Sequence, residues 1–154
     1  MRASPPIRIP KMHHKATGPV AVTGRGFAVW VIMAVSAFLN GLLREGWLIP
    51  LLGENVARPA SAMLLLVIVY LLAYLHQRWS GPITAPQALA VGVLWLTLTV
   101  ALESVLGLSQ GMSGAQILAA YSPTAPTYWI YVLAGIVLAP TLVRAPWRRS
   151  ATAG

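Results

Sequence analysis

One of the chain's acidic side chains lies where lipid would be expected to surround it. Of the three glutamates, Glu103 stands late in the apolar stretch LTLTVALESVLG, whereas Glu45 and Glu54 lie between apolar stretches. A charged residue at the centre of a membrane helix costs about 2.5–3.5 kcal/mol on insertion scales, and less near the helix ends. We therefore expect Glu103 to face other helices and to have a polar partner there.

Two arginines and an asparagine are candidates for that partner. Asn40 and Arg44 are four residues apart near the end of the first apolar stretch, and Arg58 follows Glu54 by four residues before the second. In an antiparallel bundle these positions reach the same side of the membrane as Glu103. The sequence predicts a structural ion-pair cluster of Glu103, Arg44, Arg58, Asn40 and Glu54, in which the arginines neutralise Glu103.

A second interpretation makes Glu103 a titratable group on a proton or ion path. A path of that kind continues across the membrane. The opposite half of the apolar stretches offers few polar side chains, among them Ser36, Tyr70 and Tyr74. This scarcity favours the structural cluster over a transporter formed by one chain.

No other set of residues is arranged for catalysis or metal binding. The chain has no cysteine and no aspartate, which excludes thiolate chemistry and a Ser–His–Asp triad. His13 and His14 are adjacent in a basic segment without a third ligand, and we interpret them as part of a solvated tail. His76 is isolated and is expected at the membrane interface, with a pigment ligand as the alternative. We predict no enzyme activity, no metal site and no cofactor.

The composition indicates an integral membrane protein. The chain has 154 residues, of which 57% are hydrophobic and 9% charged, and its mean hydropathy is +0.70. Soluble domains carry about 25% charged residues, so the charges here are too few to cover a water-facing surface. The net charge of +8 comes mainly from cations near the chain ends and beside apolar stretches. That distribution is typical of membrane orientation and not of nucleic-acid binding.

Four apolar stretches must position these side chains. They cover residues 27–43, 60–75, 88–106 and 128–143. With flanking turns each reaches the bilayer core thickness of about 30 Å, and backbone groups in lipid must be paired within helices. The prediction is an all-α, four-helix transmembrane bundle. Its domains are a flexible basic tail over 1–25, the membrane domain over 26–147 and a short tail over 148–154.

Local motifs predict where helices begin and touch. TAPQ at 84–87 and SGAQ at 113–116 are capping boxes, and Asn55 is a candidate cap for the second helix. GWLIPLLG at 46–53 is expected to be an interfacial loop. Pairs of small residues four apart predict close helix contacts; they are Ala37 with Gly41, Ala88 with Gly92 and Gly135 with Ala139.

The cations predict the orientation. With the N-terminus inside, nine Lys and Arg lie on the inner side, and only Arg44 and Arg58 lie outside. By the positive-inside rule both termini are cytoplasmic. The third connection, residues 107–127, contains no charged residue and includes Tyr121. We expect it to lie on the membrane and fold over the bundle, or to dock against another subunit.

Three motifs resemble a known group of proteins. LNGLLR at 39–44, VLWLTLTVALE at 93–103 and LAP at 138–140 resemble a set of small, uncharacterised bacterial four-helix membrane proteins, over roughly residues 30–145. The resemblance implies a bacterial inner-membrane location and an Arg44–Glu103 pairing, but supplies no activity.

The expected function is that of a structural or accessory subunit of a larger membrane complex. The expected partners are the lipid bilayer and other membrane subunits, which would bind the third connection or the small-residue helix faces. We expect no binding to nucleic acid. The alternative is a small proton- or ion-coupled transporter component that uses Glu103.

Overall fold

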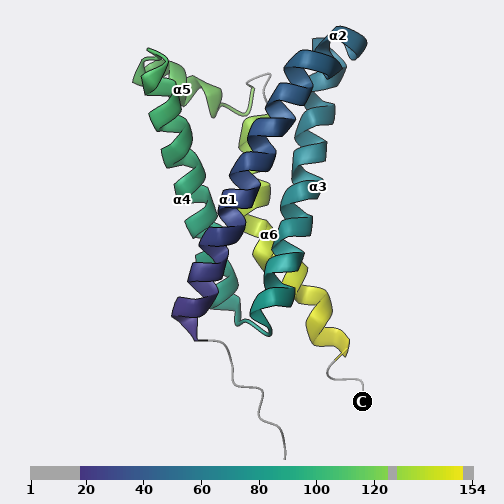
Figure 1. Ribbon diagram of the computed structural model, residues 1–154, viewed down its shortest axis with the longest axis vertical. Coiled ribbons are helices and arrows are strands. Elements are labelled where there is room, and N and C mark those ends of the chain that lie inside the picture. Colours follow the sequence, from purple (N-terminus) through teal and green to yellow (C-terminus); the bar gives the residue numbers. More distant parts are fainter. Residues whose placement is uncertain (1–17, 125–127, 151–154) are drawn as a thin grey trace, which may run out of the picture.

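The computed structural model describes residues 18–124 and 128–150, and these ranges contain helices and no strand. The elements are α1 (Pro19–Leu43), the π-helical turn η1 (Arg44–Leu48), α2 (Ile49–Leu52), α3 (Glu54–Ser80), α4 (Ala85–Ser109), α5 (Gly114–Ala120) and α6 (Trp129–Ser150) (Figure 1). His13, His14 and most of the predicted basic tail lie outside the described residues.

Three helical segments in the described part of the chain are long and apolar enough to cross a membrane. They are Val20–Leu52, Glu54–Ser80 and Ala85–Ser109, and α6 adds a shorter apolar part, Trp129–Arg144. Helices of this length and hydropathy indicate a multi-pass membrane protein. The all-helical class predicted from the sequence is confirmed.

The first span is longer than the sequence predicted. Its helix begins at Pro19, inside the expected tail, and continues through η1 and α2 to Leu52. Gly53, with φ of +75°, ends it and leads directly into α3. Glycine adopts a positive φ more readily than other residues, so the chain can reverse direction between α2 and α3 at Gly53. The interfacial loop predicted for 46–53 is therefore wrong, and so is the cap predicted at Asn55, which lies inside α3.

Both predicted capping boxes are formed. Thr84 Oγ1 accepts from the backbone N–H of Gln87, whose side chain accepts from the Thr84 N–H, and α4 begins there. Ser113 and Gln116 make the same two bonds at the start of α5. These boxes fix where the chain enters the third span and where it turns back after it.

The four long helices pack in a closed order, in which α1 contacts α3 and α4, and α6 also contacts α3 and α4 (Figure 1). Their core includes Met33, Val69, Trp95 and Ile136. The closest approach of backbones is between α4 and α6, where a Cβ on Gly92 would overlap the carbonyl oxygen of Val137. The close helix contact predicted at this glycine is therefore confirmed.

The other predicted small-residue contacts differ from one another. A Cβ on Gly135 would collide with the Leu66 side chain, so α6 and α3 are also close at that glycine. A Cβ on Gly41 would meet nothing within 4 Å. Gly41 therefore makes no close helix contact, contrary to the prediction.

One end of the bundle is where α1 and α4 begin and α3 and α6 end (Figure 1); we call it the terminal end. There Trp95, which is fully buried, donates from Nε1 to the Gly26 carbonyl oxygen at 2.7 Å. His76 Nε2 donates to the Val22 carbonyl oxygen at 3.2 Å and is also fully buried. His76 is therefore not isolated, contrary to the expectation from the sequence, because the ring ties α3 to α1.

Arginines add two further bonds at the terminal end. Arg25 donates to the Trp79 carbonyl oxygen at 3.0 Å, and Arg144 donates to the Ile83 carbonyl oxygen at 3.1 Å. The first bond joins α1 to the last turn of α3. The second joins α6 to the connection between α3 and α4. The terminal end is thus closed by side chains that bind backbone carbonyls of neighbouring elements.

Candidate functional site

A cavity of about 440 Å³ lies toward the opposite end of the bundle, which we call the Glu103 end. Residues from α1, α3, α4, α5 and α6 line it, and much of its wall is apolar, with Met33 and Leu65 among the contributors. The polar lining residues include Asn40, Arg44 and Glu103. The cavity therefore combines an apolar wall with a few polar groups, as small-molecule sites do.

Glu103 has two hydrogen-bond partners, and both are uncharged. Its Oε2 accepts from Trp129 Nε1 at 2.6 Å and from the Tyr121 hydroxyl at 3.2 Å. Trp129 is the first residue of α6, and Tyr121 directly follows α5. One carboxylate oxygen on α4 therefore holds both elements that come after it. Hydrogen bonds to an ionised acceptor are stronger than neutral ones, which offsets part of the cost of burying Glu103.

Tyr121 is suited to remain a donor. Burial raises the pKa of its hydroxyl, and the neighbouring Glu103 carboxylate raises that pKa further. Both effects disfavour a tyrosinate beside a carboxylate. The hydroxyl therefore keeps its proton at neutral pH and continues to donate it to Glu103.

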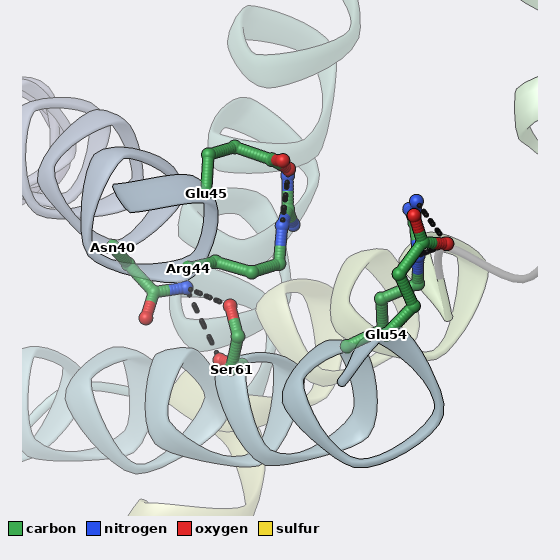
Figure 2. A network of polar contacts seen from close by, with 6 residues as sticks. Asn40, Arg44, Glu45, Glu54 and Ser61 are labelled. Atoms are coloured by element: carbon green, nitrogen blue, oxygen red, sulfur yellow. Dashed lines mark hydrogen bonds and ion pairs between the residues drawn. The ribbon is translucent and has the colours of Figure 1, made fainter. Parts of the chain in front are cut away.

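The arginines have other partners than the one predicted. Arg44 Nε binds Glu45 Oε1 at 3.0 Å, and Arg58 Nη2 binds Glu54 Oε2 at 3.0 Å (Figure 2). The predicted Glu54–Arg58 pair is thus present. The predicted neutralisation of Glu103 by an arginine is wrong, because Arg44 pairs with the adjacent Glu45 and Arg58 pairs with Glu54, four residues before it.

Asn40 lies in the interface of α1 and α3. Its Nδ2 donates to Ser61 Oγ at 2.9 Å and to the Ser61 carbonyl oxygen at 3.1 Å (Figure 2). The residue is only 6% exposed, and its Oδ1 is buried without a hydrogen-bond partner among the described residues. Leaving a buried acceptor unpaired costs about 1–3 kcal/mol. Asn40 therefore has an unsatisfied acceptor buried beside the cavity that other atoms of the residue line.

Tyr121 and Trp129 were not predicted as partners of Glu103. Their contact depends on how the third connection returns across the bundle. A Cβ on Gly107 would crowd the Ile117 side chain, so α5 packs closely on the last turns of α4. The absence of charge from residues 107–127 was the available signal, and folding over the bundle was one of the two expectations drawn from it.

Comparison of the chain with family models, with curated proteins and with solved structures gives no match. Within the described ranges, no group of three or more histidine or acidic residues is placed to hold a metal ion.

Proposed function

We propose that the chain is a four-span protein of a bacterial inner membrane that works without catalysis, as an accessory subunit of a larger membrane complex. The fourth span is α6, whose 22 residues extend about 33 Å as a helix. Support for this span comes from its packing against both α3 and α4 (Figure 1). A helix held between two membrane-spanning helices shares their surroundings.

The arrangement of arginines supports two cytoplasmic termini. Arg25, Arg78 and Arg144 belong to the terminal end of the bundle, and the cations of the N-terminal segment precede it in the chain. Arg44 and Arg58 lie at the Glu103 end, where each forms an ion pair with a glutamate. An excess of cations marks the cytoplasmic side, so the terminal end is the inner one in this proposal.

The accessory role is carried by the closure of the bundle below the cavity. Val69 and Thr99 line the cavity, but Trp95 and His76 do not, and both are fully buried. Their bonds to α1 backbone carbonyls hold the terminal half together. A cavity that ends inside a tightly bonded bundle suits a static subunit better than a conduit across the membrane.

Purification from the native membrane tests this role. A tagged full-length chain extracted in a mild detergent is expected to bring along one or a few membrane proteins in near-stoichiometric amounts, identified by mass spectrometry. The expectation follows from a chain that has neither a catalytic set nor a through-going path among its described residues. Recovery of the chain alone, as a monomer under conditions that preserve known membrane complexes, would contradict the accessory role.

The second candidate is a small proton- or ion-coupled transporter component, and the position of Glu103 on the cavity wall favours it. If the accessory role is correct, Glu103→Gln leaves the proton permeability of proteoliposomes unchanged, as judged with a pH-sensitive dye. Glu45→Gln is the matched control, because Glu45 is exposed and belongs to the same end of the bundle. A proton flux present in the natural chain and in the control, but lost in a folded Glu103→Gln variant, would establish the transporter instead.

A further inference from the structure

We propose that the cavity at the Glu103 end binds one zwitterionic phospholipid with a primary ammonium group. The ammonium is held by Glu103, the phosphate by Arg44, and an acyl chain leaves between α1 and α4. The proposal requires a membrane around the helices. It does not require a protein partner, so it stands or falls separately from the accessory role.

The Glu103 carboxylate on the cavity wall favours a ligand that donates hydrogen bonds. Glu103 uses Oε2 for both of its bonds, and its Oε1 has no hydrogen bond within the described residues. A primary ammonium has three donors and one positive charge, and it complements a carboxylate. A quaternary ammonium has the charge but no donor.

Arg44 supplies the opposite charge on the same cavity. It follows Asn40 by one helical turn, and its Nε is bound to Glu45. In the described part of the chain neither of its Nη groups has a further hydrogen bond. Guanidinium groups bind phosphate oxygens through paired N–H donors. A phosphate beside an ammonium is the chemistry that Arg44 and Glu103 recognise together.

The size of the cavity fits a headgroup with the beginning of a chain. Its volume of about 440 Å³ is within the usual range of small-molecule sites and below that of a whole lipid. The remainder of a lipid must therefore extend into the bilayer. Phe38 and Leu102 line the cavity from α1 and α4, and both side chains are exposed. They provide an apolar exit for an acyl chain.

Native mass spectrometry of the full chain tests the proposal. Protein stripped of lipid in detergent is offered equal amounts of phosphatidylethanolamine, phosphatidylcholine and phosphatidylglycerol with the same acyl chains. One phosphatidylethanolamine is expected to bind about tenfold more tightly than phosphatidylcholine, which corresponds to one hydrogen bond to a charged group. This comparison needs no variant, so it does not depend on whether a variant folds.

Variants then test which side chain binds the ammonium and which binds the phosphate. Glu103→Gln is expected to remove the preference for phosphatidylethanolamine, and Arg44→Gln to weaken the binding of all three lipids. Arg58→Gln is the matched control, because Arg58 lies at the same end but does not line the cavity, and it is expected to change nothing. Equal binding of the ethanolamine and choline lipids by the natural chain would overturn the proposal.

Discussion

Replacement of Gly92 by alanine is expected to prevent the bundle from folding stably. The added Cβ would overlap the backbone carbonyl oxygen of Val137, and α6 cannot yield there without separating from α4. Overpacking a core usually costs about 1–3 kcal/mol. Here the obstacle is backbone and not a flexible side chain, so we expect about 3 kcal/mol or more in the free energy of unfolding.

The melting temperature of the detergent-solubilised protein measures this effect. Gly24→Ala is the matched control, since Gly24 lies in α1 and a Cβ there would meet nothing within 4 Å. Removing a glycine from a helix interior gains up to about 1 kcal/mol, so the control should melt at the same temperature or slightly above. A Gly92→Ala protein as stable as the Gly24→Ala protein would show that α4 and α6 are not in contact there.

The structural class and the starts of two helices could be predicted because they depend on neighbouring residues. Helices α4 and α5 each begin at a capping box contained within four consecutive residues. The end of the first helical segment could not be predicted in the same way. We expected the first helix to end once it had reached bilayer length. In the structure the apolar residues before Gly53 continue it through one π-helical turn.

The candidate site was predicted in part. That Glu103 needs a polar partner could be predicted from its place in an apolar stretch. The identity of that partner could not. Depth along a helix placed the arginines near Glu103, but it could not show that Arg44 and Arg58 bind glutamates close to them in the chain. A pair four residues apart on one helix forms without tertiary packing.

The true partners depend on tertiary structure. Trp129 and Tyr121 reach Glu103 only because α5 packs on the end of α4 and the chain then enters α6 beside it. The partner of His76 was missed for a similar reason. Its burial depends on the Val22 carbonyl of α1, in a segment that the sequence assigned to the tail.

Glu103 is the group that holds α6 and the residue after α5 to α4. Glu103→Ala is expected to leave the Trp129 and Tyr121 donors without their acceptor, at a cost of about 2–3 kcal/mol for hydrogen bonds to a charged group. Trp129→Phe removes the shorter of the two bonds and keeps most of the apolar ring. Because the two changes remove the same bond, the double variant should be more stable than their summed effects predict.

A double-mutant cycle of Glu103→Ala and Trp129→Phe, measured as free energies of unfolding in one detergent, is the most direct test. We predict a coupling of about 1–2 kcal/mol between these two residues. In a parallel cycle Glu103→Ala and Arg58→Ala should be additive within about 0.5 kcal/mol, because Arg58 is bound to Glu54. Additivity of Glu103→Ala with Trp129→Phe, together with coupling to Arg58→Ala, would contradict the account and restore an arginine as the partner of Glu103.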